Sequence, residues 1–247
     1  MTPTRAIAIQ KRLASLVQKR PPHGTLRFVA GVDAAFSSDE QHCIAAVVLW
    51  DVHERAVVEQ QIAIRRLTFP YIPGLLSFRE AAAVIAALRK LHTYPDVLLY
   101  DGNGFAHPRR FGSACHIGVL ANLPTIGCAK SRLIGSHAEP SRKRGSSTPL
   151  VDDGQVIGSV LRTQDGVRPV YVSIGHRMDV LAAERIVLQS APRYRLPEPL
   201  RLADQLARRE CRRGSAAAST IASARCTRSG AARSMPSKPS PRVSPCR

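Results

Sequence analysis

Three runs of strand character follow one another closely near the start of the chain, and their short connections constrain the fold more than any other feature. The runs are TLRFVAGVDAAFS, HCIAAVVLWDV and AVVEQQIAIRR, separated only by SDEQ and HER. Strands joined by so few residues pair with their neighbours in antiparallel fashion. An antiparallel meander is therefore predicted over residues 25–66. A helix is predicted before it, within residues 5–18, and the sequence PPHG that follows should end this helix.

Beyond residue 66 the pattern changes to an alternation of helices and strands. A helix is predicted in LSFREAAAVIAALRKL, a strand in PDVLLYDG, a helix in PRRFGSACHIGVLANL and a strand in PTIGC. Such alternation is typical of a parallel α/β half. The basic stretch SRLIGSHAEPSRKRGSSTPL is interpreted as an exposed loop, and GQVIGSVLRT, RPVYVSIGH, VLAAERIVLQ and PLRLADQLARRE as two more strands and two closing helices.

These elements match the plan of the ribonuclease H-like fold. That is an α/β fold with a mixed sheet, three antiparallel strands and then parallel strands, flanked by helices. The pattern alone leaves other mixed α/β folds open. Residues 1–210 are predicted to form one domain. From Cys211 the composition shifts to Ser, Ala, Arg and Pro, so residues 211–247 are expected to be a disordered basic tail, either a basic arm or, as we favour, an extension without a role.

The charge balance indicates a polyanionic partner. The chain carries 36 Lys and Arg residues against 18 acidic ones, and it remains basic when the eight basic residues after Cys211 are set aside. Such an excess usually draws a protein to nucleic acid. No apolar run of membrane-spanning length and no secretory signal is present, so a cytoplasmic protein without a membrane partner is expected. The six cysteines show no C-x-x-C spacing, which disfavours disulfides and zinc.

Three acids stand at or beside the ends of apolar segments, where a carboxylate needs compensation. They are Asp33 in FVAGVDAAF, Glu80 in LSFRE and Asp101 in VLLYDGNG. Each alone has an ordinary explanation: a solvated strand residue, a favourable helix N-terminus and a turn cap, respectively. Together they fit a hard divalent cation, Mg²⁺ or Mn²⁺, because the ligand set is oxygen only.

Two loops near these acids have the character of binding segments. PYIPGLLSFRE combines two prolines and a glycine with Tyr71, Ile72 and Pro73 at its tip, which suits stacking on bases or separating them, unless Tyr71 simply packs on the helix that follows. DGNGFAHPRRFG joins Asp101 to two glycines that permit close backbone approach. It then brings His107, Arg109 and Arg110 to a helix start, an arrangement suited to phosphate.

Two further residues follow predicted strands. Lys130 after TIGCA could meet a phosphate or a developing negative charge, although a lone lysine there is usually solvated. His176 in YVSIGHR could hold a water or phosphate near the metal, although a histidine at a strand end is more often structural.

The chain resembles the endonuclease V family in six segments that occur in order over roughly residues 7–210. These are VAGVD, PYIPGLLSFRE, DGNGFAHPRRFGSACHIGVL, PTIGCAKSRL, SIGHR and YRLPEP. PYIPG followed by SFRE, and DGNG followed by HPRR, are the specific ones. The chain departs from the family by continuing beyond the last helix.

This resemblance implies a repair endonuclease that depends on Mg²⁺, or on Mn²⁺ in its place. It would act as a monomer on DNA containing deoxyinosine, hydrolysing the second phosphodiester bond on the 3′ side and leaving 3′-hydroxyl and 5′-phosphate ends. Carried over by position, Asp33, Glu80 and Asp101 resemble the metal-binding acids. Tyr71 resembles the wedge that fills the gap of a flipped base, with Ile72 and Pro73 beside it.

The resemblance also assigns the remaining residues. His107 matches a residue near the scissile strand, with Arg109 and Arg110 in the same DNA-binding segment. Lys130 matches a phosphate-contacting lysine, and His176 a histidine near the attacking water. The base pocket would involve Leu76, Gly102, Gly104, Gly127 and Ala129, largely through their backbone groups.

Three alternatives remain open. The sequence does not distinguish inosine-containing RNA from inosine-containing DNA as the substrate, because the residues that would contact a 2′-hydroxyl group cannot be identified from it. A base-excision glycosylase would also explain the basic charge and base flipping, without a metal. A non-catalytic nucleic-acid-binding protein would explain the charge but not the three acids.

Overall fold

The computed structural model describes residues 1–21, 24 and 26–229, in which one eight-stranded mixed sheet is flanked by five helices. The strands lie in the order β3-β2-β1-β4-β5-β8-β7-β6. Their bounds are β1 Phe28–Phe36, β2 His42–Asp51, β3 Ala56–Arg66, β4 Val97–Tyr100, β5 Thr125–Ala129, β6 Ser147–Asp152, β7 Gln155–Leu161 and β8 Val170–Ile174. The helices are α1 Pro3–Ala14, α2 Ser77–Leu88, α3 Ser113–Ala121, α4 Val180–Ser190 and α5 Glu198–Ser229.

The pairing confirms the predicted meander and limits the parallel part of the sheet. Strands β1, β2 and β3 pair antiparallel, as their short connections require. Strands β1, β4 and β5 pair in parallel, so these three end at the same edge. Strands β8, β7 and β6 return to antiparallel pairing, so parallel pairing is confined to β1, β4 and β5.

Strand β6 corrects an expectation from the sequence, because the stretch that contains it was interpreted as loop. It lies at the edge of the sheet and most of its side chains are exposed or half-buried. An edge strand tolerates a proline, here Pro149, since one side of it needs no ladder hydrogen bonds. Polar composition and a proline therefore hid a strand that the hairpin with β7 stabilises.

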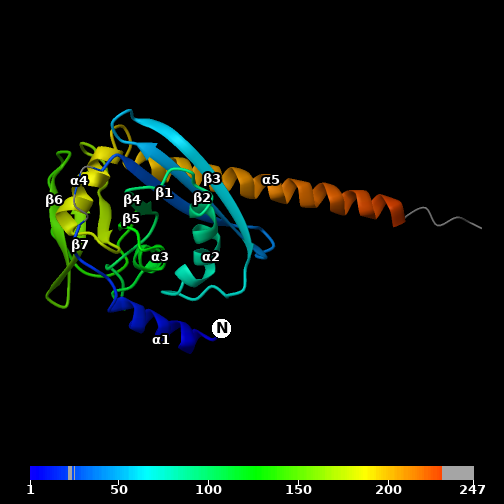
Figure 1. Ribbon diagram of the computed structural model, residues 1–247, viewed down its shortest axis with the longest axis horizontal. Helices are drawn as coiled ribbons and strands as arrows, with labels where there is room; N and C mark the ends of the chain where they lie inside the picture. The colour runs from blue at the N-terminus through cyan, green and yellow to red at the C-terminus, as the bar shows by residue number, and fades with distance from the viewer. Residues whose placement is uncertain (22–23, 25, 230–247) are drawn as a thin grey trace, which may run out of the picture.

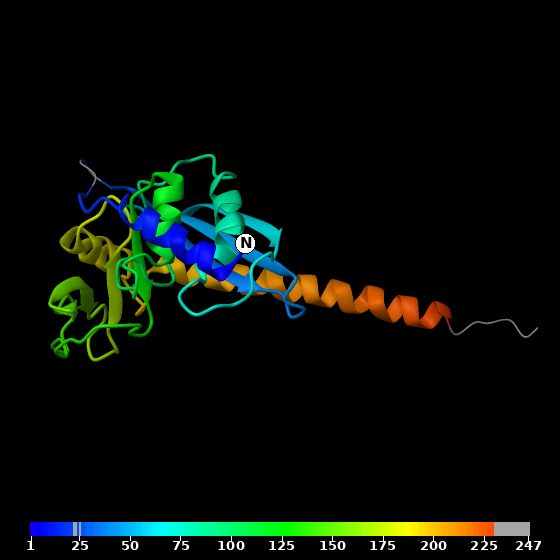
Figure 2. The ribbon, with the colours of Figure 1, turned by 90° about the horizontal axis from the view of Figure 1, so that it is seen from below.

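Helices cover both faces of the central strands (Figures 1 and 2). Ala45, Val47 and Leu49 of β2 face a core shared with α2 and α3, whereas Ala46 and Val48 contact α5. Burial on both faces explains why β2 is apolar over nearly its whole length rather than alternating. Helix α4 packs on β7 and β8 at the other end of the sheet.

The approach of α5 to β1 depends on one glycine. A Cβ atom at Gly31 would lie 2.2 Å from the carbonyl carbon of Pro199, which precludes any side chain there. The close approach brings the first turns of α5 across the face of β1, with Ala203 and Ala207 buried against β2. Small residues, Gly31 on β1 and Ala203 and Ala207 on α5, therefore determine the position of Asp204, which lies on the same helix.

Helix α5 continues past Glu210, where its prediction ended, as far as Ser229 (Figure 1). The segment SAAASTIASA is rich in alanine, the strongest helix former, which accounts for the continuation. The expectation of disorder from Cys211 thus differs from the structure over residues 211–229, and its remainder, 230–247, lies outside the described residues. Among the helices that the structure describes, none is both long and apolar enough to cross a membrane.

Candidate active site

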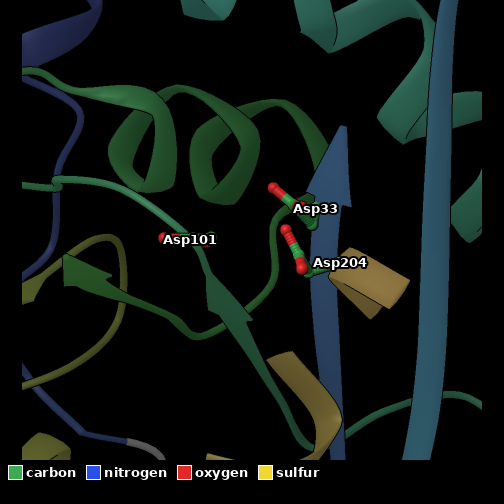
Figure 3. Close-up of side chains that lie close together, drawn as sticks. All are labelled: Asp33, Asp101 and Asp204. Atoms are coloured by element: carbon green, nitrogen blue, oxygen red, sulfur yellow. The ribbon is translucent and has the colours of Figure 1, made fainter. Parts of the chain in front are cut away.

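Three aspartates from three different elements converge at the edge where β1 and β4 end (Figure 3). Asp33 lies on β1, Asp101 directly follows β4, and Asp204 lies on α5. One carboxylate oxygen from each lies within 4.8 Å of the other two. We call these residues the aspartate cluster.

The sheet and α5 bring the aspartate cluster together. The backbone N–H of Asp101 donates a hydrogen bond to the carbonyl of Val32 at 3.2 Å. Because Val32 directly precedes Asp33, this bond holds the backbones of the two aspartates close together. Asp33 pairs in register with Ala46, and residues opposite one another in an antiparallel pair lie on the same face. That face is the one that α5 covers, so Asp33 and Asp204 meet across the sheet–helix interface.

The electrostatics of the aspartate cluster favour a bound cation. Burial, the charge of Asp101 and a hydrogen bond with Asp204 raise the pKa of Asp33 from its ordinary value of 3.8 to about 7. A raised pKa means that the ionised carboxylate lacks sufficient compensation from the protein. An all-oxygen donor set of three carboxylates is the kind that a hard divalent cation selects. The residues present therefore fit such an ion.

Glu80 approaches this site from the opposite face of the sheet but does not belong to the tight cluster. It lies in the first turn of α2 and is 6% exposed, and Tyr100 donates a hydrogen bond from its hydroxyl to Glu80 Oε2. Burial raises the pKa of Glu80 to about 7, with contributions from the charges of Asp33 and Asp101. The three predicted acids, Asp33, Glu80 and Asp101, thus lie near one another. The acid that lies closest to both Asp33 and Asp101, however, is Asp204 and not Glu80.

Asp204 is the acidic residue that sequence reasoning missed. It occurs in PLRLADQLARRE, where Leu200, Ala203 and Ala207 form the buried face of α5. Residues three or four apart share a helix face, so Asp204 lies among these apolar side chains. An acid on the apolar face of an amphipathic helix was the available signal.

Lys130 lies beside the aspartate cluster, as its position after β5 indicated. Its Nζ is 2.5 Å from Asp101 Oδ2, and its side chain is 42% exposed. Burial lowers the pKa of Lys130, but the hydrogen bond to Asp101 and the charges of Asp101, Asp204 and Asp33 outweigh it and raise the pKa above its ordinary value. The ammonium group thus stays charged and accessible at the rim.

A pocket of about 180 Å³ opens next to Asp101. It is lined by Gln10, Tyr71, Gly74, Leu76, Ser77, Asp101, Gly102, Asn103, His107, Gly112, Ser113 and Leu133. Tyr71 is 64% exposed at its rim, and Pro73 is exposed too, whereas Ile72 is half-buried against a small apolar cluster. A larger cavity, about 340 Å³, lies between α4 and the end of β2, but its lining within the described chain holds no carboxylate.

Of the five residues predicted for a base pocket, Leu76 and Gly102 line this one. Gly104 and Gly127 lie behind it: a Cβ atom at Gly104 would be 2.1 Å from the carbonyl oxygen of Ile174, and one at Gly127 would be 2.6 Å from the nitrogen of Gly104. Ala129 is buried in β5 opposite Tyr171. The two rear glycines therefore allow backbones to pack closely and do not contact the pocket space.

The segment predicted to meet phosphate has internal partners instead. Arg109 donates from Nε to Gln10 Oε1 at 2.6 Å and from Nη2 to the carbonyl of Gly74 at 2.8 Å. Arg110 forms an ion pair with Asp152 at 2.7 Å. His107 is 3% exposed, and its Nε2 lies 3.2 Å from the Gly74 carbonyl. These side chains fasten parts of the protein to one another.

His176 does not join the site. Its backbone N–H donates to Thr125 Oγ1 at 2.8 Å, and the backbone N–H of Gln18 donates to its Nδ1 at 3.4 Å. Thr125 begins β5, whereas Lys130 follows the end of that strand, roughly 16 Å away at the rise of a strand. Because β8 runs antiparallel to β5, its end points away from the aspartate cluster, and His176 has a packing role.

Comparison with known proteins assigns the chain to a family. Residues 11–205 match the family described as Endonuclease V. The sequence is 52% identical to Endonuclease V of Roseiflexus sp. (strain RS-1) over 82% of this chain and 90% of that protein. The structure of Endonuclease V from Streptomyces avermitilis superposes with a TM-score of 0.84 and 42% identity, covering 87% of this chain and 95% of that one.

A more distantly related structure is a complex with nucleic acid. Endonuclease V of Ciona intestinalis, in complex with a 24-mer DNA containing an inosine followed by a ribo-adenosine, superposes with a TM-score of 0.75 and 26% identity, covering 85% of this chain and 98% of that one. The mixed sheet with its flanking helices defines a ribonuclease H-like protein, and its cluster of carboxylates could hold a metal ion. Within that class, the chain belongs to the Endonuclease V family.

Proposed function

We propose that this protein is a metal-dependent endonuclease that nicks DNA near deoxyinosine. It hydrolyses the second phosphodiester bond on the 3′ side of the lesion and leaves 3′-hydroxyl and 5′-phosphate ends. The observation that carries the proposal is the aspartate cluster beside a pocket of about 180 Å³. The inosine-containing DNA bound by the Ciona intestinalis relative supports the choice of substrate.

The ion would be Mg²⁺, or Mn²⁺ in its place, held by Asp33, Asp101 and Asp204, with Glu80 at the opposite face. Such an ion supplies an activated water and stabilises charge on the phosphoryl oxygens and the departing oxygen. The carboxylates of the three aspartates provide the charge that attracts it. Tyr100 donates a hydrogen bond to Glu80 Oε2 and so holds this carboxyl group close enough to Asp33 and Asp101 for their charges to act on it.

Several side chains would bind and orient the nucleic acid. The ammonium group of Lys130 offers positive charge for a phosphate at the rim of the aspartate cluster. The exposed ring of Tyr71 would enter the duplex and stack in the gap left by a flipped base. Leu76 and Gly102 would line the space that receives the base. Flipping is least costly at a weakly paired base, which favours hypoxanthine over normal bases.

The test is incubation of the full chain with an end-labelled inosine duplex, and with matched DNA and RNA single strands, in Mg²⁺, in Mn²⁺ and in EDTA. We expect a nick at one position, 3′ to inosine, that requires the metal. An abasic product in EDTA would instead identify a glycosylase, and binding without any nick in Mn²⁺ a non-catalytic protein. Faster cleavage of the RNA strand would reassign the substrate to RNA.

A further inference from the structure

The loop that carries Tyr71 is held in place by polar contacts that converge on one carbonyl oxygen. We call residues 67–76, between β3 and α2, the Tyr71 loop. The carbonyl of Gly74 in this loop accepts hydrogen bonds from Gln10 Nε2 at 3.0 Å, Arg109 Nη2 at 2.8 Å and His107 Nε2 at 3.2 Å. Three donors from two distant segments thus fix the backbone three residues after Tyr71.

The protonation of His107 agrees with this arrangement. Burial and the nearby charge of Arg109 lower the pKa of His107 to about 4, so its ring is neutral near pH 7. The backbone N–H of Arg109 donates to His107 Nδ1, which must therefore be the acceptor nitrogen. The proton then lies on Nε2 and is donated to Gly74.

Gln10 is the centre of the network, since it makes hydrogen bonds with Gly74, Arg109 and Phe111. Its Nε2 donates to the carbonyls of Gly74 and of Phe111, and its Oε1 accepts from Arg109 Nε. The side chain is 1% exposed and uses both ends of its amide. Glycine at position 74 is required, because it has a φ of +77° and a Cβ atom there would lie 2.7 Å from Arg109 Nη2.

Helix α1, which carries Gln10, supports the same loop through apolar contacts. Ala6 of α1 is fully buried with Phe69 and Leu75 of the Tyr71 loop, and Ile7 and Ile72 pack against them. This cluster is separate from the cores of the sheet. Besides Ala6, Gln10 is the only residue of α1 that is buried. The buried part of α1 therefore faces the Tyr71 loop and the segment that contains His107 and Arg109.

We propose that Gln10 is a positioning residue that holds the Tyr71 loop so that Tyr71 meets the duplex in a fixed pose. This inference rests on the proposed function and adds to it a determinant of strand separation outside the six segments that carry the family resemblance. Gln10 also lines the pocket next to Asp101, together with Tyr71 and Gly74 of the loop. Loss of its hydrogen bonds would loosen the loop without removing a group from the aspartate cluster.

The experiment compares Gln10→Leu with Gln18→Leu, the same change at an exposed position beyond α1. Each variant is assayed on inosine in a fully paired duplex and on inosine in an unpaired single strand. We expect Gln10→Leu to raise KM for the paired substrate about tenfold, as for the loss of buried hydrogen bonds. On the unpaired substrate, where no strand separation is needed, its defect should be clearly smaller, and Gln18→Leu should match the wild type on both substrates. A 2-aminopurine beside the inosine should fluoresce less with Gln10→Leu, since fewer bases are unstacked.

An equal defect on both substrates would overturn the inference, because a merely structural role does not distinguish paired from unpaired inosine. No defect on either would also overturn it. Gln10→Glu keeps an acceptor for Arg109 but sets a carboxylate against two carbonyls, so we expect at least as large a defect. Should Gln10→Leu fail to fold, Arg109→Met removes another part of the network and must show the same substrate dependence. If the wild type nicks neither substrate, the proposed function fails first.

Discussion

The aspartate cluster and the Tyr71 loop border the same pocket, but their polar groups differ in how far the protein compensates them. In the aspartate cluster, one oxygen from each of the three carboxylates lies within 4.8 Å of the other two, and burial and mutual repulsion raise the pKa of Asp33 to about 7. The polar side chains that hold Gly74 of the Tyr71 loop are all hydrogen-bonded, and Gln10 and His107 among them are buried. The first region keeps charge uncompensated so that a cation is favoured, and the second satisfies its hydrogen bonds so that a loop stays in place.

The largest effect is expected from removing a carboxylate of the aspartate cluster. Asp33→Ala or Asp101→Asn should reduce nicking of an inosine duplex about a thousandfold or more, because the bound ion supplies several kcal/mol of stabilisation. Binding of the duplex, measured by gel shift, should stay largely intact. Asp153→Asn, which changes an exposed turn acid, is the matched control. Retained cleavage by either cluster variant would refute the metal assignment.

Asp204 tests whether α5 completes the cluster. We expect Asp204→Asn to slow nicking about a hundredfold and to raise the Mn²⁺ concentration needed for half-maximal rate, since one ligand of three is lost. Asp204→Glu, which keeps the charge but changes the reach, should fall between this variant and the wild type. An unaltered Mn²⁺ requirement in Asp204→Asn would separate α5 from the chemistry.

Substitutions at Tyr71 test whether the Tyr71 loop contributes to DNA binding. Tyr71→Ala should weaken binding of the inosine duplex about tenfold, because stacking on a base contributes about 1–3 kcal/mol. Tyr71→Phe retains the ring and should bind nearly as the wild type does. Tyr94→Ala removes another exposed tyrosine, 69% exposed, and serves as the control. An unchanged dissociation constant for Tyr71→Ala would argue against a wedge.

The smallest effect concerns stability in the absence of metal. Since burial raises the pKa of Asp33 from 3.8 to about 7, its stabilising contribution is full below the unfolded value and is lost as the pH rises through about 7. The Tm of the metal-free protein should therefore fall between about pH 4 and pH 7, by about 2–4 °C for each kcal/mol lost. Asp33→Asn should flatten this dependence, and Mn²⁺ should offset it at the higher pH. A Tm that rises over this range in both proteins would contradict the electrostatic account.

The periodicity of the chain predicted the meander and the main helices, because short connections and apolar spacing act locally. It failed at β6, where Pro149 and polar residues mark an edge strand whose stability comes from its partner β7. It also placed the end of α5 too early, because composition alone underestimated the helix-forming tendency of an alanine-rich segment.

For the site, motifs predicted the residues whose position follows from a strand end, such as Asp101 and Lys130. They could not reveal that His176 lies at the far end of β5, since the direction of β8 is a property of the sheet and not of YVSIGHR. Nor could they separate a side chain that meets a ligand from one that fastens a loop. Arg109 has the composition of a phosphate site but contacts Gln10, 99 residues earlier in the chain.

Because Asp204 lies on α5, the aspartate cluster can form only late in the synthesis of the chain. Gly31 and Asp33 are made early, whereas the helix that docks on Gly31 and supplies the third aspartate follows every strand of the sheet. A nascent chain that has already formed its sheet still holds only two of the three carboxylates. Synthesis order thus withholds the third carboxylate until α5 has emerged and packed, so a partly made chain lacks one member of the aspartate cluster.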